Sequence, residues 1–173
     1  QIQNVFDIDG HFALKDPRLC ILLEGMIPLL QESLLQIDFL LILRQPVEVI
    51  VSLRRAENIS SYDALNLWIG SVLRSESLSR YYRRTIFTYP QLLKAPQDVL
   101  DNCSDLWGIS FKDSKLTDAK SFIMPSLYRT KGDSVRELFM EKYPELRNLL
   151  SLADEIYSLF DQSVYDVDDF HHA

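Results

Sequence analysis

A continuous apolar run, Phe39-Leu-Leu-Ile-Leu43, followed at once by Arg44-Gln-Pro46, limits what this chain can fold into. A run of strand length that is apolar at every position is typical of a parallel strand covered on both faces. Proline suits the first turn of a helix, because its fixed φ angle is helical and its missing N–H has no partner there anyway. We therefore predict a strand over 39–43 and a helix over 46–57, a strand–helix step typical of α/β proteins.

Two similar junctions flank this one. A strand at 12–14 ends at Lys15-Asp-Pro17, and a strand at 85–89 is stopped by Pro90. The remaining pattern predicts helices over 17–35, 63–82, 91–94, 96–107, 134–142 and 144–160, with a cap at Ser60 or Ser61 and a loop over 110–131.

The chain is expected to be one α/β domain over 1–162, with a parallel sheet flanked by helices and a helix-rich C-terminal half. An acidic tail, 163–173, follows. Three strands are few for such a sheet, so further strands are expected in misread residues or upstream of Gln1.

Composition narrows the function classes. Eighteen Lys and Arg against 25 Asp and Glu give a net charge of −7, which argues against a nucleic-acid partner. Cys20 and Cys103 belong to no CxxC pair, which excludes a zinc ribbon or thioredoxin motif and favours two reduced, buried thiols. The longest apolar run, 19–35, contains Glu24 and Pro28, so it predicts a core helix, no membrane partner and a cytoplasmic protein.

Polar side chains follow all three predicted strands: Lys15, Arg44 and Tyr89. In open parallel sheets, ligands bind beyond the carboxyl ends of the strands. Two cations at one such edge, each just before a helix, predict an anion site. The alternative is that each cation merely flanks a strand and is solvated; the shared placement of the three favours the site.

The helix after Arg44 sharpens this prediction. Ser52 lies eight residues beyond Arg44, about two helical turns, so an arginine fork and a hydroxyl could engage one phosphate. Residues 44–84 hold seven Arg and four acidic residues, a local charge of +3, to which Arg54 and Arg55 contribute. For four of these arginines we favour a solvated helix face instead: Arg74, Arg80, Arg83 and Arg84.

Here the sequence resembles a known family. Arg44-x-Pro-x-x-Val-x-x-Ser52 resembles the 3′-phosphate-binding signature of sulfotransferases that use 3′-phosphoadenosine 5′-phosphosulfate (PAPS). Two other stretches resemble bacterial members of that family: Phe12-Ala-Leu-Lys-Asp-Pro-Arg-Leu-Cys20 and Phe122-Ile-x-Pro-Ser-Leu127. Thr88-Tyr-Pro-Gln-Leu-Leu93 with Pro96 resembles the family's Tyr-Glu-Asp-Leu-Leu strand and helix, and all the matches keep the family's order over about 12–127.

The resemblance implies a P-loop NTPase-like sulfotransferase fold and transfer of a sulfuryl group from PAPS to a hydroxyl or amine. The acceptor would be a small molecule or carbohydrate, and the family requires no metal. Arg44 and Ser52 would bind the 3′-phosphate, Lys15 would contact the transferring sulfuryl group as the catalytic residue, and Tyr89 would lie near the adenine. Arg129 or Lys131 would close over the 3′-phosphate.

The sequence also departs from the family. Its Ser/Gly/Thr-rich loop for the 5′-phosphosulfate and its usual catalytic base are not seen, and Pro90-Gln91 stands where acidic residues are usual. The start at Gln1 and the small strand count favour an incomplete fold, the carboxyl-terminal part of a longer enzyme. The alternative is a catalytically inactive sulfotransferase-fold binding or scaffolding module. A nucleotide-kinase-like P-loop protein ranks last, because its Gly-rich Lys-Ser/Thr loop is missing too.

Overall fold

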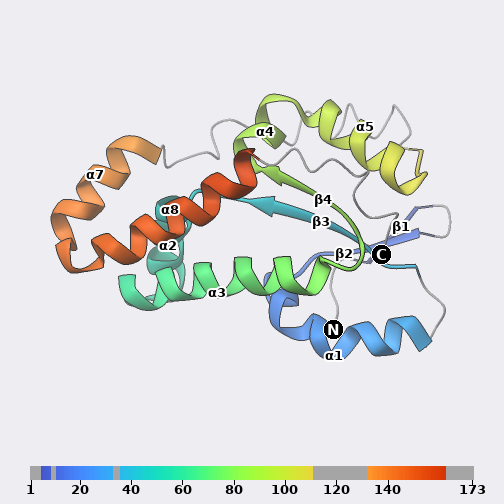
Figure 1. The fold of residues 1–173 in the computed structure, drawn as a ribbon, viewed down its shortest axis with the longest axis horizontal. Coiled ribbons are helices and arrows are strands. Elements are labelled where there is room, and N and C mark those ends of the chain that lie inside the picture. Colours follow the sequence, from blue (N-terminus) through green and yellow to red (C-terminus); the bar gives the residue numbers. More distant parts are fainter. Residues whose placement is uncertain (1–4, 9–10, 33–35, 111–131, 163–173) are drawn as a thin grey trace.

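A computed structural model describes residues 5–8, 11–32, 36–110 and 132–162 (Figure 1). Its strands are β1 (Val5–Ile8), β2 (His11–Leu14), β3 (Asp38–Leu43) and β4 (Arg83–Thr88). Its helices are α1 (Leu19–Glu32), α2 (Pro46–Glu57), α3 (Ser61–Ser79), α4 (Tyr89–Lys94), α5 (Pro96–Trp107), α7 (Gly132–Lys142), the 3-10 helix η2 (Pro144–Leu146) and α8 (Arg147–Gln162). The α/β prediction is confirmed, with helices predominating.

The two central strands form a parallel pair. β3 and β4 run in register from Asp38 opposite Arg83 to Leu43 opposite Thr88. The crossover between them is made by α2 and α3, as a parallel pair requires. Because both strands end at the same rung, the residues that follow them emerge at one edge.

The first predicted strand is confirmed as β2, but its partner differs from the prediction. β2 pairs antiparallel with β1, and within the described residues this hairpin is a sheet separate from the β3–β4 pair. The sequence between the two strands is Asp9-Gly10, a dipeptide that favours a two-residue hairpin turn. The expectation of three strands in one parallel sheet is therefore wrong for this part of the chain.

Local capping explains where the helices begin and end. α1 begins at Leu19, two residues later than predicted, and before it the Asp16 side chain accepts from the Arg18 N–H and from the Arg18 guanidinium. The Ser60 hydroxyl caps α3 by accepting from the Asp63 N–H at 3.0 Å. Gly108 ends α5 with a left-handed φ of 68°, a conformation that glycine adopts without strain. The predicted α5 boundaries are confirmed.

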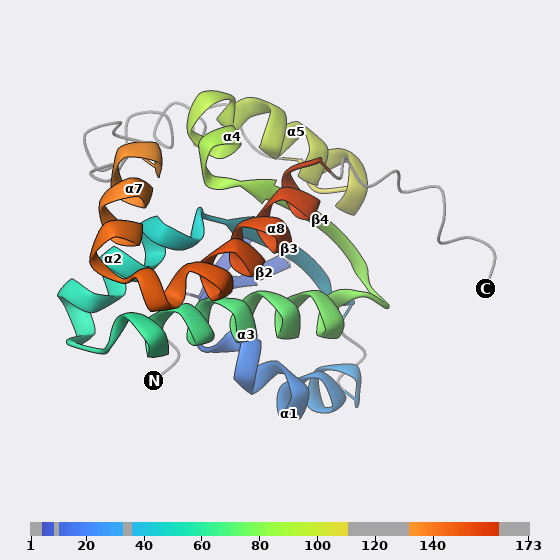
Figure 2. The same cartoon turned by 60° about the vertical axis from the view of Figure 1, so that its left-hand side comes forward.

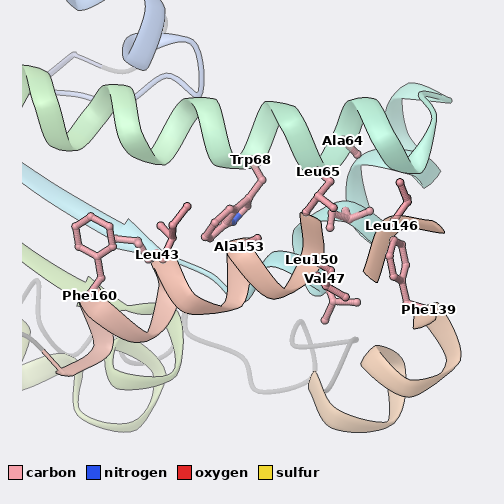
Figure 3. Packing of buried hydrophobic residues seen from close by; sticks show 12 residues of the cluster. Leu43, Val47, Ala64, Leu65, Trp68, Phe139, Leu146, Leu150, Ala153 and Phe160 are labelled. Carbon is pink, nitrogen blue, oxygen red and sulfur yellow. The ribbon is translucent and has the colours of Figure 1, made fainter. Parts of the chain in front are cut away.

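The hydrophobic core lies beneath the carboxyl end of the parallel pair. α8 packs against α2, α3 and β4 (Figures 2 and 3). This packing buries apolar side chains of α2, α3 and α8, and Ile86 of β4 is partly buried against them. Trp68 of α3 lies in this cluster at 5% exposure, so its prediction as a core residue is confirmed. Leu43, Val47 and Ile50 continue the cluster from β3 into α2.

One face of β3 is covered less than the sequence predicts. Leu43 is buried in the core, whereas Leu40 and Ile42, which point to the opposite face, are 44% and 38% exposed. Cover on both faces is therefore not found for this strand in the part of the chain that the structure describes. None of the described helices is both long and apolar enough to cross a lipid bilayer.

Candidate functional site

Arg44 and Tyr89 meet at the carboxyl edge of the parallel pair. Each is the first residue after its strand, and the two strands end opposite each other at Leu43 and Thr88. The Arg44 guanidinium carbon lies over the Tyr89 ring at 5.1 Å from the ring centre, which is a cation–π contact. The prediction that these two side chains share an edge is confirmed, although Tyr89 opens α4 and does not belong to β4.

Arg44 is fixed at its backbone and at its side chain. The Trp68 indole N–H donates to the Arg44 carbonyl at 3.2 Å, and the Arg44 Nε donates to Glu48 Oε2 at 2.8 Å. The Glu48 side chain is completely buried, while that of Arg44 is 27% exposed. Arg44 is thus held at both its backbone and its partly exposed side chain.

Ser52 is an exposed residue in α2, one turn beyond Glu48. Residues four apart on a helix lie on the same side, so Ser52 follows Glu48 along α2, while Arg44 lies two residues before the helix. Four residues advance about 6 Å along the helix axis. Arg44 thus precedes the helix, Glu48 lies in its first turn, and Ser52 lies one turn further along.

Lys15 does not share this edge through strand pairing. It follows β2, which belongs to the separate hairpin, and its side chain is exposed. The prediction that all three residues follow strands of one sheet is therefore wrong. β3 and β4 bring Arg44 and Tyr89 together, whereas Lys15 follows a strand of the other pair. Arg129 and Lys131 lie outside the described residues.

A buried polar residue, Thr88, ends β4 directly before Tyr89. Thr88 is 2% exposed, and its N–H donates to the Gln91 side chain at 2.7 Å, which fixes the start of α4. Tyr157 reaches Thr88 from α8. Burial raises the pKa of the Tyr157 hydroxyl, its hydrogen bond with Thr88 acts in the opposite direction, and the Asp161 and Glu48 carboxylates add to the increase.

Sequence reasoning missed Glu48 and Tyr157. Glu48 carries a recognisable signal, since a carboxylate four residues after an arginine at a helix start can pair with it. Tyr157 carries none, because it lies in a helix about 70 residues away from Thr88 in the sequence. Only the packing of α8 on β4 brings it there.

The four arginines expected on a solvated helix face all form ion pairs, and the side chains of Arg74 and Arg80 are exposed as expected. Arg83 makes a two-pronged bond to Asp38, Arg74 pairs with Glu24, and both Arg80 and Arg84 pair with Glu76. The Arg84 side chain is only 7% exposed, so the solvated-face prediction is wrong for it. Arg83 and Arg84 lie in β4, because α3 ends at Ser79.

Comparisons of this chain with protein-family models, with curated proteins and with solved structures find no match.

Proposed function

We propose that this chain is the nucleotide-binding part of a PAPS-dependent sulfotransferase with a P-loop NTPase-like fold. The observation that carries the proposal is the meeting of Arg44 and Tyr89 at the ends of two parallel strands, at 5.1 Å, with Ser52 two turns into the helix that Arg44 precedes. This arrangement suits a ligand that joins a phosphate to an aromatic base. The motif resemblance over about 12–127 favours PAPS as that ligand.

The proposed roles follow from the chemistry of each side chain. The Arg44 fork binds the 3′-phosphate, because a planar guanidinium can donate two parallel hydrogen bonds to phosphate oxygens. The Ser52 hydroxyl donates to the same phosphate, and Tyr89 lies beside the adenine. Arg129 or Lys131 adds positive charge over the 3′-phosphate.

The proposed reaction passes the sulfuryl group of PAPS to a hydroxyl or amine of a small-molecule or carbohydrate acceptor. Like phosphoryl transfer, it depends on in-line positioning and on stabilising charge in the transition state. Lys15 is the proposed cation at the transferring group.

Isothermal titration with 3′-phosphoadenosine 5′-phosphate (PAP) tests the nucleotide site, with adenosine 5′-phosphate as the ligand that lacks the 3′-phosphate. Arg44→Lys keeps a cation beside buried Glu48 but removes the fork, and should weaken PAP binding by about 1.5–3 kcal/mol. Ser52→Ala should cost about 1 kcal/mol.

Ser77→Ala, an exposed serine on α3, is the matched control and should leave binding unchanged. Equal affinities of the wild type for PAP and for adenosine 5′-phosphate would defeat the proposed 3′-phosphate site.

A second candidate function is nucleotide binding without transfer. It is favoured by the position of Lys15, which is exposed and belongs to a strand pair separate from the one that bears Arg44. Incubating the complete natural protein with PAPS labelled in its sulfuryl group decides between the two. Label on an acceptor supports the enzyme; PAP binding with no labelled product supports the binding module.

A further inference from the structure

Arg54, in the last turn of α2, is a partly buried cation that forms no ion pair with any described residue. By contrast, carboxylates pair with Arg18, Arg44, Arg74, Arg80, Arg83, Arg84 and Arg136. The Nε of Arg54 is buried and has no hydrogen-bond partner among the described residues. Native proteins leave few buried donors unpaired, so this one points to a partner that the described chain does not supply.

The Tyr143 ring brings a second cation to Arg54. α7 packs against α2 (Figure 1), and Lys142 and Tyr143 lie at the end of α7. The guanidinium carbon of Arg54 lies 5.1 Å from the ring centre, and the Lys142 Nζ lies 5.7 Å from it. Lys142 is exposed and forms no ion pair with a described carboxylate, so the cluster opens to solvent on its side. Two like charges at one ring repel each other, and an anion between them would relieve that repulsion.

The Tyr143 hydroxyl marks the place where these groups meet. The neighbouring Ser61 hydroxyl lowers the pKa of Tyr143, and the charges of Arg54 and Lys142 lower it further. Ser61 is 5% exposed, and its Oγ has no hydrogen bond of normal geometry to a described residue. It is also the first residue of α3, a helix of 19 residues whose N-terminus carries a partial positive charge. The surroundings of the Tyr143 oxygen therefore favour negative charge and offer unpaired donors.

A phosphate group suits this cluster better than a carboxylate does. The nearest acidic residue of α3, Asp63, accepts from the Ser60 hydroxyl at 2.6 Å and forms no ion pair with either cation. A phosphate monoester carries up to two negative charges and three terminal oxygens, so it can meet donors that come from three directions. The net charge of −7 repels a large polyanion such as a nucleic acid, which favours a small ligand.

We propose that Arg54, Lys142 and Ser61 form, around Tyr143, an anion site that binds a phosphate group, either as free phosphate or as the phosphate monoester of a small molecule. This site is separate from the one at Arg44, and it does not rest on the proposed function. Arg44 precedes the start of α2 and Arg54 lies in its last turn, and a helix of 12 residues is about 18 Å long.

An NMR titration with inorganic phosphate tests the site, with sodium chloride holding the ionic strength constant. The backbone N–H signals of Ser61 and Tyr143 should shift and reach saturation. Arg54→Gln should raise the dissociation constant read from these signals by about tenfold or more, because it removes a charged donor. Lys142→Gln should raise it by about threefold or more. Acetate, with a single charge, should bind more weakly than phosphate.

Arg55→Gln is the matched control. It removes the same charge from the next residue of α2, which is exposed. It should leave the dissociation constant for phosphate within about twofold of the wild type, because general attraction between the protein and an anion is screened by salt. Glycerol phosphate as a second ligand distinguishes the two sources of the group. Tighter binding than that of inorganic phosphate supports a monoester ligand, and equal binding supports free phosphate.

Three results would overturn the site at Tyr143. The first is the absence of saturable shifts at Ser61 and Tyr143, which would mean that the ring alone holds the two cations. The second is equal weakening by Arg54→Gln and Arg55→Gln. The third is phosphate binding that Arg44→Lys abolishes and Arg54→Gln leaves intact, which would place the phosphate at the site of the proposed function. If Arg54→Gln does not fold, Lys142→Gln, at an exposed position, decides with the same criteria.

Discussion

At the scale of single residues, Arg44 owes its position to three separate parts of the chain. α3 holds its carbonyl through Trp68, α2 holds its Nε through Glu48, and the residue after β4 supplies the ring on its face. Glu48 lies in the first turn of α2 and Tyr89 opens α4, whereas Trp68 lies in the middle of α3. A surface arginine on a loop would have no comparable constraint.

The two cysteines are both free and buried, as predicted. Burial raises the pKa of the Cys103 thiol to about 11, so almost no thiolate forms near neutral pH. In a Cys20→Ser variant, we expect a thiol-reactive disulfide reagent at pH 8 to leave native Cys103 unmodified and to react fully after denaturation. Rapid stoichiometric reaction of the folded variant would contradict this.

The candidate site could be predicted in part at this scale. Arg44 and Tyr89 were accessible to sequence reasoning, because each follows an apolar run and parallel strands end at one edge. Lys15 follows an apolar run too. Strand pairing is not encoded in such a run, and the hairpin with β1 places Lys15 in a different sheet.

At the scale of elements, α3 is linked to β4 through Glu76. The Glu76 carboxylate accepts from Arg80 Nε at 3.1 Å and from Arg84 Nη2 at 3.1 Å, and the Glu76 carbonyl accepts from Arg84 Nη1 at 2.8 Å. These bonds join the last turn of the crossover helix to the strand that follows. They help to fix the direction in which β4 enters the sheet.

This link predicts a dependence of stability on pH. The Arg80 hydrogen bond, with Arg84, lowers the pKa of Glu76 below its ordinary 4.5. A lowered folded-state pKa contributes stability above the unfolded pKa, and that contribution is lost as the pH falls. We expect Glu76→Gln to reduce the free energy of unfolding at pH 7 by about 1 kcal/mol.

The difference between Glu76→Gln and the wild type should narrow in urea denaturation as the pH falls below 4.5. Glu155→Gln, at an exposed position of α8, is the control and should differ little from the wild type at either pH. A difference that stays constant with pH would show that the charge of Glu76 contributes nothing.

At the scale of the whole molecule, the core and the candidate site share their elements. β3, α2 and α3 supply both the buried cluster and the residues around Arg44, and α8 covers them. Loss of core packing should therefore loosen the site as well as the fold.

Leu150 and Leu152 of α8 offer a matched test of that core. Leu150 is completely buried and Leu152 is 47% exposed. Leu150→Ala should lower the free energy of unfolding by about 2–5 kcal/mol, and Leu152→Ala by about 1 kcal/mol or less. Chemical denaturation measures both, and similar losses would place the core elsewhere.

Most helices and the two parallel strands could be predicted because proline, glycine and serine mark their ends. The α5 boundaries follow from Pro96 and Gly108, and the α3 start from Ser60. What the sequence could not provide were long-range contacts: the antiparallel pairing of β2, the covering of the site by α8, and the open face at Leu40 and Ile42.

The hydrogen bond from Trp68 to the Arg44 carbonyl has a practical consequence. The emission of an indole depends on its local field and hydrogen bonding, and this indole is buried next to the backbone of the residue proposed to contact phosphate. Trp107, the other tryptophan, lies at the end of α5. A Trp107→Phe protein would therefore carry a single tryptophan, beside Arg44, so that selective excitation of its indole could follow ligand titrations without an attached dye.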